Sequence, residues 1–340
     1  MPTIYDVAKL ASVSPATVSR VVNQRGNVRP DMASRVNEAI EALDYRPNVV
    51  ARNLRRQTSA VWTLIFSDID AFHFTAVSRG VMEIGQDVGK SVVLCNTDDE
   101  PDKEQRYIEV AVADRVAGVV ISPASESGGV LEPLLELDIP VVTIDRDLPS
   151  SAVGSVLVEN ERGAEQATAH LLASGYGRIA CITGDLALST AAQRLAGYRG
   201  ALEAAGVPYD PALVRTTDYR EAGGYRAMSQ LLELDRPPDA VFVANSQMTL
   251  GALECLADRG VSIPDEMGIV GFDEHPWARL VSPALTTVAQ PTYELGRVAA
   301  QMLVERAKDP GGPPTRVSLP TELIVRESST PRRRAPARQR

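Results

Sequence analysis

The sequence has few cysteines and no long apolar run. Its three cysteines, Cys95, Cys181 and Cys255, lie far apart in a chain of 340 residues, which excludes a disulfide framework or a cysteine zinc site. Charged or polar residues or prolines interrupt every apolar stretch well before the 18 residues that a membrane helix needs, and the first residues show no secretory signal. We therefore expect a cytoplasmic protein of two or three domains with no membrane partner.

The sequence also lacks an excess of basic charge. Its formal net charge of −9 by itself disfavours nucleic acid as a partner. The charge is unevenly distributed, however: residues 1–57 carry nine Lys and Arg against five Asp and Glu, residues 331–340 carry five arginines and no acid, and residues 58–330 therefore hold a net −18. The basic head indicates either a solvated helical surface or a surface that binds a polyanion.

The first 45 residues predict three short helices. Thr3 and Asp6 form a capping-box pattern at the first start, Ser14 followed by Pro15 marks the second, and Pro30 marks the third. Apolar residues recur at helical spacing in the three segments, namely Val7, Ala8 and Leu10, then Val18, Val21 and Val22, then Val36, Ile40 and Leu43. A short turn between the first two helices is typical of a helix-turn-helix unit, whose second helix reads DNA.

Four strings in this region resemble the headpiece of the lactose/galactose repressor family (LacI/GalR). They are TIYDVA at 3–8, VSPATVSRVVN at 13–23, LDYRPN at 43–48 and ARNL at 51–54. One departure is Ser12, where the family usually has glycine in the turn, so we expect a left-handed backbone at this serine. The resemblance implies a sequence-specific transcriptional regulator, most often a repressor, that binds double-stranded operator DNA as a homodimer.

The resemblance assigns DNA contacts residue by residue. Base-reading positions in the major groove are matched by Pro15, Ala16 and Arg20. Phosphate-contacting positions are matched by Tyr5, Ser14, Thr17, Ser19 and Asn23. Residues 47–59 match the family's hinge helix and linker, where the expected contacts are Asn48, Ala51 and Leu54, and the leucine wedges into a minor-groove base step. The alternative is that Leu54 packs against the body of the protein.

The remaining sequence alternates short Val- and Ile-rich runs with amphipathic segments. The expected strands are 61–66, 91–95, 118–121, 141–144, 179–183, 240–244, 268–271 and 286–289, and the expected helices are 74–88, 161–174, 191–205, 247–259 and 291–307. Uninterrupted apolar strands between helices predict an α/β protein with doubly wound parallel sheets. The family resemblance implies a two-lobed core of the periplasmic-binding-protein type I fold.

The predicted domain organisation has four parts. An all-α helix-turn-helix headpiece spans 1–46, and the hinge helix and linker span 47–59. An effector-binding and dimerisation core spans 60–329, with an N-lobe of 60–159 and 291–320 and a C-lobe of 160–290 and 321–329. An Arg-rich tail at 330–340 is expected to be disordered, and its lack of a leucine heptad favours a dimer over a tetramer.

Polar and aromatic residues follow the ends of the expected strands, where ligands bind to doubly wound sheets. These candidate effector-binding residues are Asp70, Phe72, Phe74, Asp145, Arg146, Arg194, Tyr219, Asn245, Asp273 and Gln290. Carboxylates, amides and guanidinium groups bind pairs of hydroxyls, and aromatic faces cover the apolar side of a sugar. The set favours a neutral monosaccharide, because a phosphorylated ligand would need more basic groups and a purine would need more stacking with fewer carboxylates.

The likeness is strongest to ribose-type repressors, and it assigns similar roles. Hydroxyl-binding positions are matched by Asp145, Arg146, Arg194, Asn245, Asp273 and Gln290, and a stacking position is matched by Tyr219. The first loop departs from the pattern, because DAFHF stands at 70–74 where the family often has Asn-Pro-Phe-Phe. This departure argues against carrying ribose itself over as the effector.

Other function classes find little support. GYGRIA at 175–180 fits a dinucleotide-binding pattern, but such glycines must follow a strand and open a helix, whereas these end a helix and precede a strand. An exported sugar-binding protein would not need residues 1–57. We find no nucleophile elbow, P-loop or zinc-protease motif, so the sequence predicts no enzyme, no cofactor and no metal site.

Overall fold

The computed structural model describes residues 2–22, 27–45, 59–125, 129–148 and 153–331. The chain divides into two compact units, Met1–Ser59 and Ala60–Arg340, each of which is described by itself. Asn23 and the predicted hinge contacts Asn48, Ala51 and Leu54 lie outside the described residues, as does the Arg-rich stretch from 332 onward.

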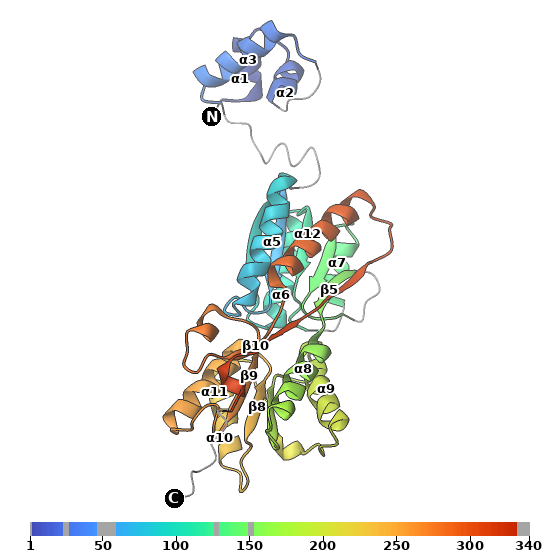
Figure 1. Cartoon of the computed structure of the whole chain (residues 1–340). Coiled ribbons are helices and arrows are strands. Elements are labelled where there is room, and N and C mark those ends of the chain that lie inside the picture. Colours follow the sequence, from blue (N-terminus) through green and yellow to red (C-terminus); the bar gives the residue numbers. More distant parts are fainter. Residues whose placement is uncertain (1, 23–26, 46–58, 126–128, 149–152, 332–340) are drawn as a thin grey trace, which may run out of the picture. The chain divides into compact units, whose positions relative to one another are not determined.

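The described residues of the first unit form the three predicted helices α1 (Ile4–Leu10), α2 (Pro15–Val22) and α3 (Pro30–Ala42) (Figure 1). The capping box is present, since the backbone N–H of Thr3 donates to the Asp6 carboxylate at 2.7 Å and the N–H of Asp6 donates to the Thr3 hydroxyl. Ser12 has a φ of 53°, which confirms the expected left-handed turn.

The core of the headpiece is formed by small and β-branched residues from all three helices. Its buried members are Val7, Ala8, Ala11, Val18, Val36 and Ala39. Leu10, which we expected on the buried face of α1, is 55% exposed. That prediction was wrong because the buried stripe of α1 passes through positions 7, 8 and 11, and position 10 falls outside it.

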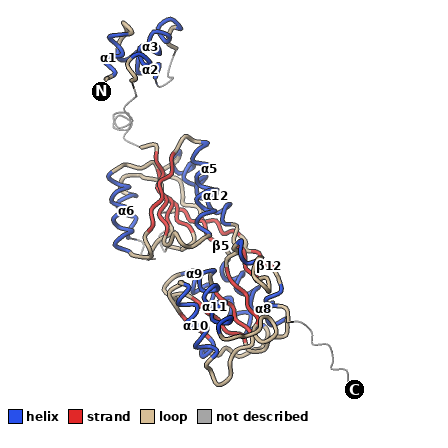
Figure 2. Tube along the Cα trace, turned by 90° about the vertical axis from the view of Figure 1, so that its left-hand side faces the viewer, coloured by secondary structure: helices blue, strands red, loops and turns tan. Residues whose placement is uncertain are grey.

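The second unit contains two sheets, the first of which we call the N-lobe sheet. Its order is β11-β5-β4-β3-β1-β2, with every pair of neighbours parallel. The strands are β1 (Val61–Phe66), β2 (Ser91–Asn96), β3 (Gly118–Ile121), β4 (Val141–Ile144), β5 (Gly154–Val158) and β11 (Arg316–Leu319). Helices α5 (His73–Asp87) and α12 (Thr292–Lys308) cover one face, and α6 (Pro101–Ala113) and α7 (Glu132–Leu135) cover the other (Figure 2).

The C-lobe sheet has the order β12-β10-β9-β8-β6-β7 and is parallel except for the edge pair of β10 and β12. Its strands are β6 (Ile179–Thr183), β7 (Val214–Thr216), β8 (Ala240–Val243), β9 (Gly268–Phe272), β10 (Thr286–Ala289) and β12 (Glu322–Ile324). Helices α8 (Asn160–Ala173) and α9 (Ser189–Ala204) pack together, as do α10 (Glu221–Leu232) and α11 (Ser246–Asp258). The fold class predicted from the sequence is confirmed.

The chain passes between the two sheets three times. It leaves the N-lobe after β5 and enters α8 at Asn160, returns from β10 to α12 at Gln290 and Pro291, and crosses again between β11 and β12. The first and third crossings are joined, because the backbone N–H of Glu159 donates to the carbonyl of Leu319 at 2.9 Å.

All eight predicted strands are present with bounds that differ by at most one residue. The prediction missed β5, β7, β11 and β12, and it missed the helices α6, α7 and α10. Strands β11 and β12 are short edge strands of alternating exposure, so they lack the continuous apolar run by which the others were found. No helix among the described residues is long and apolar enough to cross a membrane.

Candidate functional site

The second helix of the headpiece presents most of its predicted DNA contacts to solvent. Ser14, Pro15, Ala16 and Arg20 are exposed, while Thr17 and Ser19 are half-buried. Tyr5 on α1 is 69% exposed, which is unusual for so large an apolar ring. The Ser14 hydroxyl accepts from the backbone N–H of Thr17 at 3.2 Å, so it caps α2 and fixes the start of the candidate reading helix.

A cavity of about 50 Å³ lies between the carboxyl ends of the two sheets. Its N-lobe lining follows β1, β2 and β4, and its C-lobe lining follows β7, β8 and β9 together with residues of α9 and α11. Seven of the ten predicted effector-binding residues, all within the described part of the chain, line it: Phe74, Asp145, Arg146, Arg194, Tyr219, Asn245 and Asp273. These side chains are far apart in the sequence, and they meet because each follows the carboxyl end of a strand or begins a neighbouring helix.

Arg146 is held from the N-lobe side. Its guanidinium is almost fully buried, forms an ion pair with Asp99 at 2.7 Å and donates to the carbonyl of Pro123 at 2.8 Å. Asp145 precedes it and also lines the cavity. These contacts leave Arg146 immobile, so its remaining donors point in a set direction.

Arg194 is held from the C-lobe side. Its Nε donates to the side-chain oxygen of Asn160 at 2.8 Å, and one terminal nitrogen donates to the carbonyl of Ala244 at 2.6 Å. The guanidinium carbon lies 3.7 Å from the centre of the Phe272 ring, a cation–π contact in a buried setting.

Asn245 has a structural task in addition to lining the cavity. Its side-chain oxygen accepts from the N–H of Met248 at 2.8 Å and caps α11, and its amide nitrogen donates to the carbonyl of Tyr219 at 3.0 Å. One N–H and one lone pair of the amide remain for a ligand. Tyr219 is half-buried, and desolvation raises the pKa of its hydroxyl.

Backbone strain gathers around this cavity. Asp99, Asp145, Tyr219 and Asp273 have φ values of 60°, 64°, 59° and 76°. Such left-handed residues cost about 1 kcal/mol or more each when they are not glycine, and they are found preferentially where a binding site depends on them. Aspartate tolerates this conformation, whereas for Tyr219 it is a marked departure.

Three predicted effector contacts do not line the cavity. Asp70 is exposed, because the Asp68 carboxylate accepts from its backbone N–H at 3.0 Å in a local turn. The Phe72 ring instead packs against His275 of the other lobe, with ring centres 4.1 Å apart. Gln290 lies behind the site and donates to the Asp273 carboxylate. The structure therefore does not bring these three side chains into the lining of the cavity, because the direction of a loop cannot be read from its residue types.

Other lining residues were not among the predicted contacts. They are Ser67, Asp68, Ala71, His73, Asp99, Ser246 and Gln247. Asp68 and Asp99 lie shortly after the ends of β1 and β2, so they too fit the expectation that ligand contacts follow the ends of strands. Ser246 and Gln247 begin α11, and only the fold shows that the first turn of this helix faces the cleft.

Side chains also join the two lobes at the cleft. Asp68 of the N-lobe and Arg220 of the C-lobe form an ion pair at 2.8 Å. The backbone N–H of Asp147 donates to the hydroxyl of Ser189 at 3.1 Å. With the Phe72–His275 ring contact, these bonds hold the lobes together on the side that faces the cavity.

Glu104 on α6 is a buried carboxylate beneath Arg146. One of its oxygens accepts from the N–H of Ala124 at 2.5 Å, and burial raises the pKa of Glu104 above its ordinary value. The folded protein therefore holds this proton more tightly than the unfolded chain does, and the ionised group destabilises the fold once the pH exceeds the ordinary pKa of 4.5.

Replacing Glu104 by Gln should therefore stabilise the protein more at pH 7.5 than at pH 4.5. The amide oxygen can still accept from Ala124, and the side chain at position 104 then carries no buried charge. Urea unfolding of both proteins at the two pH values measures the difference in the free energy of unfolding. Glu109→Gln, an exposed carboxylate on the same helix, controls for the loss of one charge. A stability difference that stays constant with pH would contradict the prediction.

Gly184, directly after β6, makes room for Tyr219. A side chain at this position would overlap the Tyr219 ring, whereas one at Gly177 would meet a single atom at 3.8 Å. We expect Gly184→Ala to lower the free energy of unfolding by about 1–3 kcal/mol through overpacking, and Gly177→Ala to leave it unchanged. Thermal unfolding of both variants tests this, and equal stability of the two would show that the ring moves away freely.

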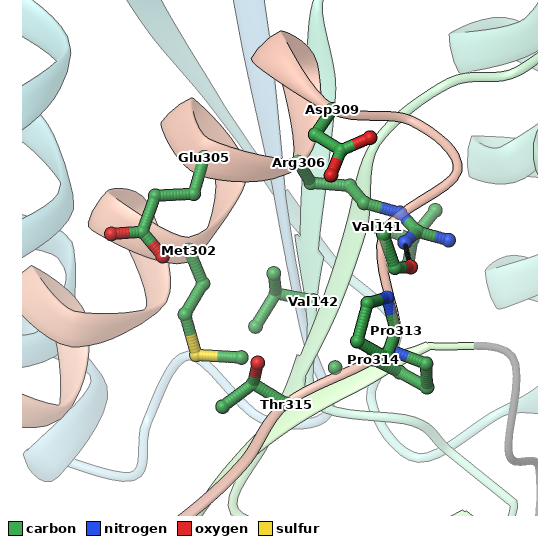
Figure 3. Close-up of a pocket in the computed structure, with 11 residues that line it drawn as sticks. Val141, Val142, Met302, Glu305, Arg306, Asp309, Pro313, Pro314 and Thr315 are labelled. Atoms are coloured by element: carbon green, nitrogen blue, oxygen red, sulfur yellow. Dashed lines mark hydrogen bonds between the residues drawn. The ribbon is translucent and has the colours of Figure 1, made fainter.

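A second cavity, of about 220 Å³, lies in the N-lobe at the amino ends of β4 and β5 (Figure 3). Val142 and Met302 contribute to its apolar lining, and Arg306 donates to the carbonyl of Gly312. All of its lining residues belong to the N-lobe. A ligand there would not contact both lobes.

The GYGRIA string lies between a helix and a strand. Gly175, with a φ of 97°, ends α8 and precedes β6, so GYGRIA does not open a helix over a phosphate. No group of three His, Cys, Asp or Glu side chains in the described ranges is placed to hold an ion.

Two family models match this chain. Residues 3–48 match the model described as bacterial regulatory proteins, lacI family, and residues 168–329 match the model described as a periplasmic binding protein-like domain. Among curated proteins, the ribose operon repressor of Halalkalibacterium halodurans is 35% identical over 329 residues, which cover 97% of each chain.

Solved structures show the same similarity. A structure titled as a complex of the transcriptional regulator CelR with cellobiose is 33% identical, with a TM-score of 0.73 over 96% of this chain and 100% of that one. The lac repressor dimer bound to operator and an anti-inducer is 27% identical, with a TM-score of 0.86 over 96% of this chain and 99% of that one.

Proposed function

Because the chain belongs to the lacI family of bacterial regulatory proteins and is a DNA-binding transcriptional regulator, we propose that it binds a near-palindromic operator as a homodimer under the control of a neutral monosaccharide. The observation that carries the proposal is the cavity lined by strand ends of both lobes. A ligand that contacts both lobes binds one lobe arrangement better than another, and by linkage it shifts the DNA affinity that depends on that arrangement.

The charges of the cavity support a neutral ligand. Its lining includes the carboxylates of Asp68, Asp99, Asp145 and Asp273 and the guanidinium groups of Arg146 and Arg194. Arg146 is already paired with Asp99, so the excess of carboxylates would repel a phosphate. Paired carboxylate and guanidinium groups suit neighbouring hydroxyls of a sugar, and the half-buried ring of Tyr219 offers an apolar face.

The exposed surface of the headpiece supports the proposal that the protein binds DNA as a dimer. The exposed side chains of α2 match the family's groove-reading positions, and a related protein is a dimer on its operator. Two headpieces related by a two-fold axis read two half-sites in opposite directions. We propose that residues 47–59 form the hinge. Through it, the arrangement of the lobes would set the spacing of the two headpieces on the half-sites, with Leu54 inserted into the minor groove.

The proposal is tested in two steps on the full chain. Thermal unfolding is followed with D-ribose, D-xylose, D-glucose, D-galactose and cellobiose, and with glucose 6-phosphate as an anionic control. We expect a neutral sugar to raise the unfolding temperature by mass action and the phosphate ester to have no effect. A larger shift with the phosphate ester would overturn the assignment of a neutral ligand.

The second step measures the affinity of the protein for DNA. A duplex selected from random sequence by the protein is titrated at several salt concentrations, with and without the stabilising sugar. We expect salt-sensitive, sequence-specific binding whose affinity changes several-fold with sugar. The direction of the change distinguishes induction from corepression. Absence of salt-sensitive duplex binding would refute the role as a regulator.

A further inference from the structure

The side chains that face the cleft from the C-lobe are bonded to the segments that cross between lobes. Arg194 donates to Asn160 at 2.8 Å, and Asn160 is the first residue of α8 after the first crossing. Asp273 accepts from Gln290, which follows β10 at the second crossing. Both contacts connect a candidate ligand-binding group to the backbone about which the lobes would rotate.

Asn160 is suited to this connection by its burial and its bonds. It is 2% exposed, and its side-chain nitrogen donates to Gln193 at 3.3 Å while its oxygen accepts from Arg194. The preceding residue, Glu159, is bonded to the third crossing through Leu319 at 2.9 Å and through the hydroxyl of Thr321 at 3.4 Å. One short chain of bonds therefore runs from the cavity to two crossings.

The other contacts of Arg194 leave it little freedom. Its stacking on Phe272 and its bond to the carbonyl of Ala244 fix the plane of the guanidinium within the C-lobe. Nε is then the part that faces the crossing, and Asn160 is its partner there. A change in the backbone at 159–160 would move the acceptor of Arg194, and a ligand that fixes Arg194 would resist that change.

We propose that Asn160 is a positioning residue that couples occupancy of the cleft to the arrangement of the lobes through Arg194. The inference rests on the proposed function, because it names the regulatory connection of the same site. It assigns Asn160 no contact with the sugar. Its effect should be seen as a change in the coupling between two ligands, not as loss of the fold.

The test uses the full chain with three single substitutions, Asn160→Ala, Asn160→Asp and Gln193→Ala. The probes are the selected duplex and whichever of D-ribose, D-xylose, D-glucose, D-galactose or cellobiose stabilises the wild type most. Sugar affinity is measured by calorimetry, and operator affinity is measured with and without saturating sugar. The ratio of the two operator affinities is the coupling factor.

We expect Asn160→Ala to weaken sugar binding about tenfold and to bring the coupling factor within twofold of one. Asn160→Asp keeps an acceptor for Arg194 and should restore most of the coupling. Gln193→Ala removes the other partner of Asn160 and should match the wild type in both measurements. This pattern separates positioning of Arg194 from a general effect on α8.

Two other outcomes would contradict the role of Asn160 or the proposed function. If Asn160→Ala lowers the unfolding temperature but keeps the wild-type coupling factor at saturating sugar, Asn160 is only structural and the inference is overturned. If no sugar changes the operator affinity of the wild type itself, the proposed function fails, and with it the coupling that Asn160 would carry.

Discussion

Replacing Arg20 with alanine should lower operator affinity about a hundredfold while sugar affinity stays unchanged. Arg20 is exposed on the last turn of α2, the helix whose neighbouring residues match the reading positions of the family. A guanidinium bonded to a guanine edge contributes about 1–3 kcal/mol of discrimination, and a dimer would lose two such contacts. Every 1.4 kcal/mol corresponds to a tenfold change in affinity.

Arg29→Ala is the matched control for this experiment. Its guanidinium is also exposed in the headpiece, but it is bonded to Asp31 at 3.1 Å and lies just before α3. We expect this variant to lose little affinity. Titration against the selected duplex and against duplexes changed at single base pairs shows whether Arg20 reads a base or a phosphate. Equal losses for Arg20→Ala and Arg29→Ala would mean that charge alone is responsible.

Asp273→Asn should weaken sugar binding about thirtyfold or more and abolish the sugar response, while operator affinity without sugar is retained. A hydrogen bond to a buried charged acceptor contributes about 1.5–3 kcal/mol, and a carboxylate can accept from two hydroxyls at once. Asparagine tolerates the left-handed backbone that Asp273 adopts, with its φ of 76°, so the strand end should keep its shape.

Asp70→Asn is the control for the loss of one carboxylate near the cleft. Asp70 was predicted as a contact with equal weight, yet it is exposed and does not line the cavity. Calorimetric titration of both variants with the stabilising sugar should therefore give wild-type affinity for Asp70→Asn only. A retained response in Asp273→Asn would remove Asp273 from the binding site.

Local sequence signals predicted the headpiece well. A capping box, a Ser-Pro helix start and apolar spacing are interactions within a few residues, so Thr3, Asp6 and Ser14 could be assigned before the fold was known. The prediction failed for Leu10, which is exposed. In a helix of seven residues the buried stripe is narrow, so a residue one position away from a buried one can face solvent.

Long buried strands were equally visible in the sequence, and edge strands were not. β4 and β9 are continuous apolar runs, buried along their whole length. β11 and β12 pair only after the chain has crossed between the lobes. The partner of β11 is β5, which lies about 160 residues earlier in the sequence. No local pattern reports such pairing.

The charge imbalance and the order of strands and loops were determined by the sequence alone. A basic head, an acidic body and polar residues after apolar strands are properties of composition and spacing, and they predicted a small helical domain joined to an α/β body. The DNA-binding and ligand-binding roles came from the resemblance of the quoted strings to the LacI/GalR family.

Only the tertiary structure decided which polar residues face the cavity. Asp68 and Asp70 stand two residues apart after the same strand, yet a turn directs Asp68 inward and Asp70 to solvent. Gln290 supports Asp273 from behind, and Asn160 supports Arg194. The direction of a side chain at a strand end depends on hydrogen bonds between segments that are distant in sequence, and those bonds exist only once both lobes have folded.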